Sequence, residues 1–321
     1  MRFLSAILVA ALTTTIFAQP SGTLRLYTSQ PEADAAQTVA AFEAAHPDVT
    51  VEVFRSGTEE VIGRFLLEAE AGEPQADVLL VADAPTFEIL KTRDLLEPYL
   101  SPNAEAIDAQ YRDLEGYYYG TKIIATVIVY NTNLVSDPVD SWTALSQLGE
   151  GVAMPSPSYS GAAAYNLGVF KRTEGIGFDF YQNLSDKAFL TQGNGAVLKA
   201  VAAGEQPYGV MVEFLPIREA KNGSPIGVVY PSEGVPIITE PVGIVKGTPN
   251  LEAAQAFVDF LLSQAGQEVA ATMGYMPLRS DVAAPEGFPA LSDLQVLTVD
   301  AATLAEEREA DKEEFALLFG E

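Results

Sequence analysis

Runs typical of β-strands alternate with runs typical of α-helices along most of this chain, and this alternation restricts the fold more than any other feature. Residues 23–29 alternate as a strand does, and residues 32–46 place apolar side chains such as Val39 and Phe42 at helical spacing. The pattern returns in two more strand–helix pairs, at residues 49–57 with 58–73 and 76–83 with 84–96. Alternation of this length predicts a parallel or mixed sheet with helices on both faces.

A second round of the same pattern follows an extended run at residues 123–134. Its strand-like runs are residues 151–158, 207–213 and 226–234, and its helix-like runs are residues 161–175, 196–205, 216–223 and 251–272. Two rounds in a chain of 321 residues predict an α/β protein with two lobes, each containing a mixed sheet, joined by extended crossings.

The chain has one histidine and no cysteine, which removes most enzyme chemistry. Zinc sites rich in imidazole and cysteine nucleophiles need residues that are absent. A Ser–His–Asp triad would depend on His46, which precedes Pro47 at the junction of a helix-like and a strand-like run. We therefore expect a binding protein that needs no cofactor, not an enzyme. An exposed histidine at a helix end is the simpler interpretation of His46.

The N-terminus has the pattern of a secretory signal. Arg2 precedes an apolar run at residues 4–12, and Ala18 precedes the polar break at Gln19. We expect cleavage after Ala18, so that residues 1–18 form a signal peptide and the mature chain works in the periplasm. Because the chain lacks cysteine, it cannot carry a lipid anchor on an N-terminal cysteine, and its fold must be stable without disulfides.

The formal net charge is −26, from 44 acidic and 18 basic residues. A nucleic acid partner and an anionic membrane surface both require a basic face, so the charge disfavours them. Capture of cations is one interpretation of the acidity, and solubility, including in saline surroundings, is the other. Acids concentrate at residues 305–314, where a solvated helix face is the simplest account.

Six collinear segments resemble a known family. They are residues 26–47, 55–83, 117–135, 198–213, 227–236 and 242–279. In this order they resemble the type II periplasmic solute-binding proteins of ABC importers, in the branch that contains ferric-ion, phosphonate and hexose-phosphate binders. The resemblance implies a Venus-flytrap fold, a small ligand held in a cleft between the lobes, and a membrane permease as partner. We expect a monomer.

The resemblance also divides the chain into lobes. Lobe one is expected to contain residues 21–127 and 236–278, and lobe two residues 128–235 and 279–321. Ferric binders of this family carry a tyrosine pair whose phenolates ligate the metal, and alignment places Phe214 and Leu215 there. Neither side chain can donate to Fe³⁺, which prefers anionic oxygen. Tyr117, Tyr118 and Tyr119 remain as phenolates from another part of the chain.

Residues 158–163 are the first candidate for ligand binding. Ser160 can cap a helix whose first turn holds Gly161 and Ala162, and these small residues leave the terminal amides open to an anion. The hydroxyls of Ser158, Tyr159 and Ser160 would add donors. An ordinary N-cap, without any ligand, explains the same pattern.

Residues 56–59 are the matching candidate in lobe one. Ser56, Gly57 and Thr58 would present amides and hydroxyls to the cleft. The alternative is a capping box, in which Ser56 and Glu59 only satisfy the start of the helix. Glu59 and Glu60 would repel an anion unless they point away from it.

Polar residues at strand ends complete the candidate site, because ligands of open α/β sheets bind at the carboxyl edge of the strands. Tyr27 and Ser29 end the first strand, and Asp83 and Glu213 end later ones. The two carboxylates suit sugar hydroxyls or an ammonium group, or else each caps the helix that follows. Tyr119 is a further candidate, and Thr121 and Arg218 are secondary ones, with Arg218 as a fork for phosphate unless it pairs with Glu219 or solvent.

These residues predict a receptor that closes over a small organophosphate or phosphonate and delivers it to an importer. A ferric-iron receptor, with Fe³⁺ as the ligand, is the alternative within the same family. A glycoside hydrolase that uses two carboxylic acids is the remote alternative, because the composition permits no other acid–base scheme.

Overall fold

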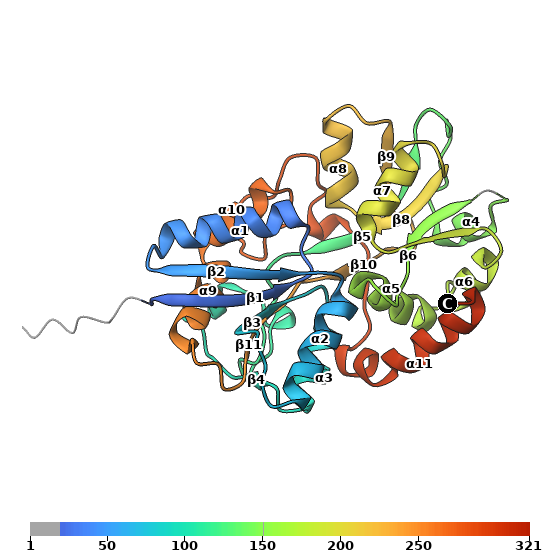
Figure 1. Cartoon of the computed structure of the whole chain (residues 1–321). Coiled ribbons are helices and arrows are strands. Elements are labelled where there is room, and N and C mark those ends of the chain that lie inside the picture. The colour runs from blue at the N-terminus through green and yellow to red at the C-terminus, as the bar shows by residue number, and fades with distance from the viewer. Residues whose placement is uncertain (1–19, 150) are drawn as a thin grey trace, which may run out of the picture.

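The computed structural model describes residues 20–149 and 151–321. The predicted signal peptide, residues 1–18, lies outside the described residues. Within them, no helix combines the length and the apolar character that crossing a lipid bilayer requires. The described chain forms two mixed sheets, one on each side of a pair of crossing segments (Figure 1).

The first sheet has five strands in the order β2-β1-β3-β11-β4. These strands are β1 (Gly22–Thr28), β2 (Val49–Arg55), β3 (Val78–Leu80), β4 (Leu96–Glu97) and β11 (Val242–Val245). Strand β1 pairs in parallel with β2 and β3, and β11 runs antiparallel to β3 and β4. The first sheet is therefore completed by a strand from late in the sequence.

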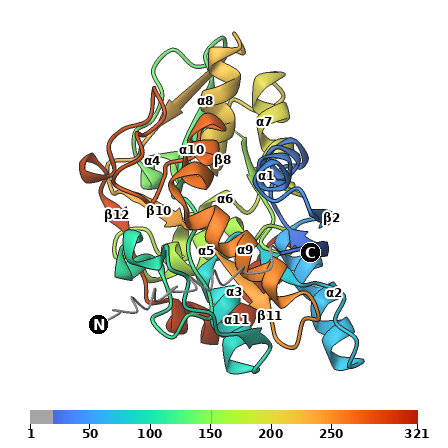
Figure 2. The same ribbon diagram turned by 90° about the vertical axis from the view of Figure 1, so that its left-hand side faces the viewer.

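Helices cover both faces of the first sheet. They are α1 (Glu32–Ala45), α2 (Thr58–Glu70), α3 (Ala84–Thr92), α9 (Leu251–Leu262) and α10 (Gln264–Thr272). Val78 and Leu80 pack toward Phe42 of α1 and Phe257 of α9, whereas Leu79 packs toward α2 and α3. Because β3 is buried on both faces, all its side chains are apolar. Figures 1 and 2 show α1 on one side of this sheet and α2 and α3 on the other. We call this unit lobe one.

The second sheet follows the order β12-β10-β5-β8-β6-β7, with β9 also paired to β5. Its strands are β5 (Ile124–Asn131), β6 (Val152–Pro155), β7 (Ala188–Thr191), β8 (Tyr208–Val212), β9 (Ile226–Val229), β10 (Val235–Ile238) and β12 (Val296–Leu297). Strand β5 is antiparallel to β8, β9 and β10, and β6 is parallel to β7 and β8.

Six helices pack around the second sheet. They are α4 (Trp142–Gln147), α5 (Gly161–Arg172), α6 (Asp179–Leu184), α7 (Asn194–Ala202), α8 (Phe214–Lys221) and α11 (Ala301–Phe319), and three short 3₁₀ helices complete the chain at Ala104–Ala106, Ala109–Tyr111 and Leu291–Asp293. An aromatic core of Trp142, Phe170, Phe180 and Phe315 joins α4, α5, α6 and α11. On the other sheet face, Val197 of α7 lies in a separate cluster. We call this unit lobe two.

The chain passes between the lobes three times: two of the crossings are short and adjacent, and the third, residues 273–295, leads from α10 to β12. The backbone N–H groups of Thr121 and Lys122 both donate to the carbonyl of Thr239, at 2.9 and 3.2 Å. One segment leads into β5 and the other leaves β10, so the sheets exchange at residues 122–124 and 238–242. These positions lie within several residues of the predicted lobe boundaries at 127 and 236, which stay predictions. Two short crossings of this kind permit rotation of one lobe against the other.

Helix α11 departs from the prediction for residues 305–314. It is not simply a solvated face, because Arg308 and Asp311 are buried. Asp311 pairs with Lys171 and Arg172 of α5, at 2.8 and 2.6 Å. The helix packs against α5 of lobe two and also against α3 of lobe one, and Figure 1 shows it below α5. Helix α11 therefore connects the two lobes away from the crossing segments.

Candidate functional site

A cavity of about 460 Å³ lies between the lobes. Lobe one contributes the ends of β1, β2 and β3, and lobe two contributes the starts of α5 and α7 and the end of β8. The lining residues are Ser29, Pro31, Arg55, Gly57, Thr58, Ala82, Ile124, Tyr159, Ser160, Ala162, Gln192, Gly193, Asn194, Gly195, Ala196, Lys199, Val212, Phe214, Leu215, Ile238 and Glu240. A hollow of about 730 Å³ is larger, but residues of lobe one alone line it, among them His46 and Asp259. Of these two cavities, the smaller is the one that lobe rotation can close.

Three helices begin at this cavity. Helices α2, α5 and α7 follow the N-cap residues Gly57, Ser160 and Gly193, all of which line the cavity. The hydroxyl of Ser160 accepts from the amide of Ala163 at 3.3 Å, so its predicted role as a cap is confirmed. First-turn amides have no partner within their own helix, and the N-terminal end of a helix is electropositive. The three starts together create a positive field in the cavity.

Two cationic side chains add to this field. Arg55 donates its Nε to the carbonyl of Gln30 at 2.7 Å, which leaves its terminal nitrogens available. Lys199 extends from α7. In the part of the chain that the structure describes, neither residue forms an ion pair, although most other lysines and arginines do. In a protein with a net charge of −26, two cations without carboxylate partners on one cavity indicate a place for an anion.

Glu240 is the one carboxylate among the residues that line the cavity. Its Oε2 accepts from Gln30 at 3.2 Å and is ion-paired to the buried ammonium of Lys122. Burial raises the pKa of Glu240, and Lys122 opposes that rise. Its backbone φ of 40° lies in the left-handed region, which is strained for a residue with a side chain and is found most often at functional sites. Because the ammonium of Lys122 neutralises the carboxylate of Glu240, this residue adds little net negative charge to the cavity.

The remaining wall of the cavity is apolar. Ile124, Val212, Phe214, Leu215 and Ile238 form it. The ring of Phe214 packs on Tyr275, with 4.3 Å between the ring centroids. A bound molecule would therefore meet charge at the helix starts and an apolar surface beside the crossing segments.

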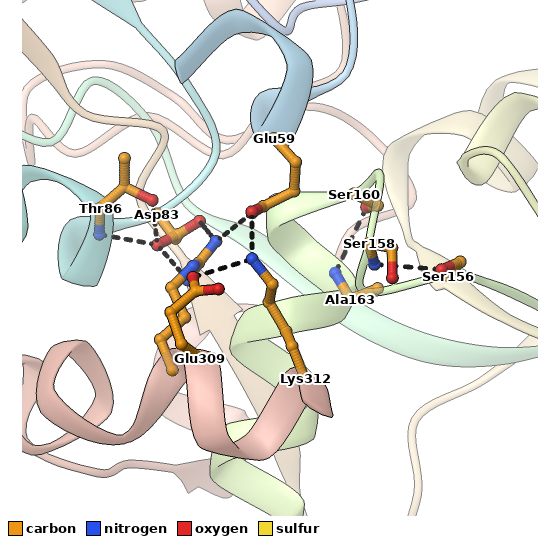
Figure 3. A network of polar contacts seen from close by, with 10 residues as sticks. Glu59, Asp83, Thr86, Ser156, Ser158, Ser160, Ala163, Glu309 and Lys312 are labelled. Carbon is orange, nitrogen blue, oxygen red and sulfur yellow. Dashed lines mark hydrogen bonds and ion pairs between the residues drawn. The ribbon is translucent and has the colours of Figure 1, made fainter. Parts of the chain in front are cut away.

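An ion-pair network lies directly beside the cavity. The guanidinium of Arg308 donates to both oxygens of Asp83, at 3.1 and 3.2 Å, and to Glu59 at 2.6 Å. The ammonium of Lys312 donates to the other oxygen of Glu59 at 2.7 Å. Figure 3 shows Glu59, Asp83 and Lys312 pointing toward one another. The cations come from α11, whereas both carboxylates belong to lobe one.

Five of the predicted residues line the cavity, namely Ser29, Gly57, Thr58, Ser160 and Ala162. Gly161 lies at the contact between the lobes. A Cβ atom added to Gly161 would stand 2.6 Å from Oδ2 of Asp83 and 2.8 Å from Cβ of Thr58. The absence of a side chain at Gly161 is thus what lets α5 approach lobe one.

Asp83 and Glu213 do not line the cavity. Asp83 caps α3 by accepting from the amide of Thr86 at 3.0 Å, which is the simpler role considered for it, and it also pairs with Arg308. Glu213 accepts from the amide of Ala125 at 3.0 Å and from the hydroxyl of Tyr230 at 2.5 Å. Burial raises the pKa of Glu213. Both carboxylates thus have structural partners.

Tyr27 and Tyr119 also lie elsewhere. The hydroxyl of Tyr27 donates to Glu68 at 2.8 Å, and burial raises the pKa of Tyr27 to about 12. The hydroxyl of Tyr119 donates to the carbonyl of Tyr99 at 2.6 Å. Both rings lie in the hydrophobic core of lobe one. The packing of these two rings against neighbouring residues keeps them out of the cavity, and their positions in the sequence do not reveal this packing.

Ser56 and Ser158, which precede α2 and α5, also form hydrogen bonds within the protein. The capping box of Ser56 with Glu59 is wrong, because α2 has Gly57 as its N-cap and Ser56 bonds to Glu60 instead. Ser158 donates to Glu321 at 3.2 Å and does not line the cavity.

Arg218, a secondary candidate, forms a bidentate pair with Asp34 of α1 at 2.8 and 2.7 Å, which makes a second connection between the lobes. Its guanidinium is therefore committed to lobe one, and neither Glu219 nor phosphate is needed as its partner.

Tyr159, which lies in the predicted segment 158–163, also lines the cavity. Several lining residues were not predicted: Arg55, Gln192, Asn194, Gly195, Lys199 and Glu240. One local signal was available. Gly193 and Gly195 flank Asn194 directly before a helix-like run, which repeats the small-residue start seen at Gly161. Arg55 and Lys199 carry no such signal, because an isolated cation on a strand end or helix is common on any surface.

The cavity offers few donors for Fe³⁺. Phe214 and Leu215 line it at the positions where the resemblance implied a tyrosine pair. Tyr159 is the one tyrosine among the lining residues, and Tyr118, which lies outside this lining, donates to Glu88 at 2.5 Å. Within residues 20–149 and 151–321, no three side chains of histidine, cysteine, aspartate or glutamate cluster as metal ligands.

Two α/β lobes joined by three crossing segments, with a cavity between them, define the class of type II periplasmic binding proteins. Residues 24–276 match the family described as bacterial extracellular solute-binding proteins, so the chain belongs to that family. The predicted family and the predicted α/β fold class are both confirmed.

Known proteins are similar over most of the chain. It is 25% identical over 264 residues to the Fe(3+)-binding periplasmic protein of Serratia marcescens, which covers 78% of each chain. It is 26% identical to the probable ABC transporter periplasmic-binding protein y4fP of Sinorhizobium fredii, over 80% of this chain and 73% of that protein. The periplasmic binding protein AfuA of Actinobacillus pleuropneumoniae, solved with fructose-6-phosphate, superposes with a TM-score of 0.85 at 24% identity, over 94% of this chain and 99% of AfuA.

Proposed function

We propose that this solute-binding protein captures a small organophosphate or phosphonate anion in the interlobe cavity and delivers it to an ABC permease from the periplasm. One observation carries the proposal: Arg55, Lys199 and the starts of three helices converge on one cavity, while the lone lining carboxylate, Glu240, is paired with Lys122. The periplasmic names of two relatives agree with this location. A monomer without cofactor or enzymatic activity is part of the proposal.

The number of donors suits such a ligand. Hydrogen bonds to a charged group contribute about 1.5–3 kcal/mol each. About four to six of them, less the cost of ordering, reach the roughly 8 kcal/mol that corresponds to micromolar affinity. The amides of α2, α5 and α7, the guanidinium of Arg55 and the ammonium of Lys199 could supply that number. The similar protein AfuA was solved with a sugar phosphate, which is the same chemical class.

Ferric iron is the second candidate, since a relative that matches 78% of this chain is named as an Fe(3+)-binding protein. Tyr159 and Glu240 are the lining residues that offer anionic oxygen. One phenol and one paired carboxylate leave most of the coordination sphere of Fe³⁺ to an accompanying anion. A carboxylate-based hydrolase would need two carboxylates facing one substrate, and Glu240 has no second carboxylate beside it in the lining.

Titration calorimetry tests the proposal with glucose 6-phosphate, 2-aminoethylphosphonate, inorganic phosphate and ferric citrate. We expect micromolar binding of a phosphate or phosphonate. Replacing Arg55 by Ala should weaken it by about 10-fold or more, because a hydrogen bond to a charged group is lost. Lys246→Ala is the matched control, since Lys246 pairs with Asp94 on the exposed surface of lobe one. Tight iron binding with a visible phenolate band, and no response to any phosphate or phosphonate, would replace the proposal with the ferric one.

A further inference from the structure

We propose that Arg308 of α11 is a positioning residue for anion binding: it joins the lobes beside the cavity and neutralises two carboxylates that lie next to the anion site. The effect on anion binding rests on the proposed function, whereas the connection that Arg308 makes between the lobes does not. Arg308 belongs to lobe two, because Leu304 and Phe315 of the same helix lie in that lobe's core. Its two partners, Asp83 and Glu59, belong to lobe one.

The network is buried and its charges are matched. Asp83 is fully buried and Arg308 is 6% exposed. Two cations, Arg308 and Lys312, face the buried carboxylate of Asp83 and that of Glu59, and Thr86 fills a further acceptor site on Asp83. Lys312 also pairs with Glu309, whose carboxylate is exposed to solvent. A buried ion pair of this kind contributes little to stability compared with an apolar contact, but removal of one partner leaves a buried charge that is strongly unfavourable. Such a set of residues is therefore sensitive to any separation of the lobes.

The network also lies next to the cavity in the sequence of lobe one. Glu59 follows Thr58 in the first turn of α2, and Asp83 follows Ala82, and both Thr58 and Ala82 line the cavity. The start of α5 approaches so closely that a Cβ atom on Gly161 would reach Oδ2 of Asp83. Without Arg308, Asp83 would have no cationic partner among the described residues and Glu59 would keep only Lys312, so net negative charge would stand beside the helix starts that attract the anion. Burial alone would raise the pKa of Glu59, but Arg308 and Lys312 outweigh burial and hold the pKa of Glu59 below its ordinary value.

These observations link closure of the lobes to the net charge beside the anion site. When the lobes separate, Arg308 moves with lobe two and both carboxylates remain with lobe one. Net negative charge then lies beside the anion site. When the lobes meet, that charge is neutralised and the three helix starts act on the ligand unopposed. Arg308 thus strengthens anion binding in the closed state without contact with the ligand.

Two variants separate this role from simple packing. Arg308→Met removes the cation, and we expect it to weaken binding of glucose 6-phosphate or 2-aminoethylphosphonate by about 10-fold or more, as loss of one partner of a buried charge pair does. The double variant Glu59→Gln/Asp83→Asn removes both carboxylates and keeps Arg308, and asparagine still caps α3. The amide oxygens can still accept hydrogen bonds from the buried guanidinium of Arg308, so the lobes stay joined while the negative charge is removed. We expect this variant to bind these anions as well as or better than the wild type. Arg279→Met is the control, because Arg279 pairs with the half-exposed Asp281 within one loop.

Small-angle scattering of the ligand-free variants keeps the inference testable if no probe binds. Arg308→Met should have a larger radius of gyration than the wild type, and this outcome does not depend on the ligand. Failure of every probe to bind the wild type would refute the proposed function alone. The inference itself is overturned if Arg308→Met changes neither affinity nor scattering, or if the double variant loses as much affinity as Arg308→Met does.

Discussion

Replacement of Gly161 by Ala should keep the lobes apart while leaving each lobe intact. The added Cβ atom would stand 2.6 Å from Oδ2 of Asp83 and 2.8 Å from Cβ and Cγ2 of Thr58, whereas ordinary contacts begin at 3.4 Å. Asp83 cannot move aside, because Thr86 and Arg308 hold it and it is fully buried. The lobes must therefore separate by several tenths of an ångström or more at this point.

The magnitude follows from two opposing effects. Alanine has a higher helix propensity than glycine, so the variant should gain about 0.4–1 kcal/mol in the free energy of unfolding of lobe two. Overpacking of a close contact costs about 1–3 kcal/mol, and here that cost falls on the closed state alone. Since about 1.4 kcal/mol is a factor of ten, affinity for an anionic ligand should fall by roughly 5- to 150-fold.

Calorimetry with the best ligand and thermal unfolding without ligand measure both effects on one sample. Gly63→Ala is the control, because Gly63 lies in α2 and a Cβ atom there meets nothing within 4 Å. We expect both variants to melt at or above the temperature of the wild type, and only Gly161→Ala to bind more weakly. Unchanged affinity in Gly161→Ala would refute the close approach of α5 to lobe one as a requirement for binding.

Three further predictions concern neighbouring residues. Phe214→Tyr places a phenol on the cavity wall and should create or strengthen Fe³⁺ binding, seen as a visible charge-transfer band; no band would mean that the wall does not face a metal position. Arg218→Met leaves Asp34 without its bidentate partner and should lower the free energy of unfolding by about 1–3 kcal/mol in urea titrations. Burial raises the pKa of Glu213 above its ordinary value of 4.5, so the folded state retains a proton that the unfolded state loses, and stability falls as pH rises through this window. Glu213→Gln should accordingly gain stability relative to the wild type between pH 4.5 and 7 in the same titrations, and a constant difference would contradict the raised pKa.

The fold was predictable because its signals are local. Alternation of strand-like and helix-like runs depends on residues within one turn or one pleat, and the buried strand at Val78–Leu80 shows it clearly. The cap at Ser160 was predictable for the same reason, since a hydroxyl that precedes a small-residue helix start has few other uses.

The side chains that line the cavity were less predictable, because their placement depends on distant partners. Asp83 ends a strand as a ligand-binding residue does, yet its partner Arg308 is 225 positions away. Residues 305–314 suggested a solvated helix because charged residues are rarely buried, and the exception at Arg308 follows only from the proximity of two lobes. Arg55 and Lys199 became visible as a pair only when the fold brought β2 and α7 to one cavity.

The net charge of the whole protein is negative, whereas the cavity is electropositive. This difference should affect the rate at which an anion associates. At a net charge of −26, an approaching anion is repelled at long range, and salt screens that repulsion beyond about 8–10 Å at moderate ionic strength. Inside the cavity, Arg55, Lys199 and the helix starts attract the anion at contact distance, where screening is weaker. Association should therefore become faster as salt rises, the reverse of an electrostatically steered encounter. Stopped-flow measurement of the association rate at several salt concentrations distinguishes the two cases, and a rate that falls with salt would mean that the field at the cavity mouth, not the field of the whole surface, governs the encounter.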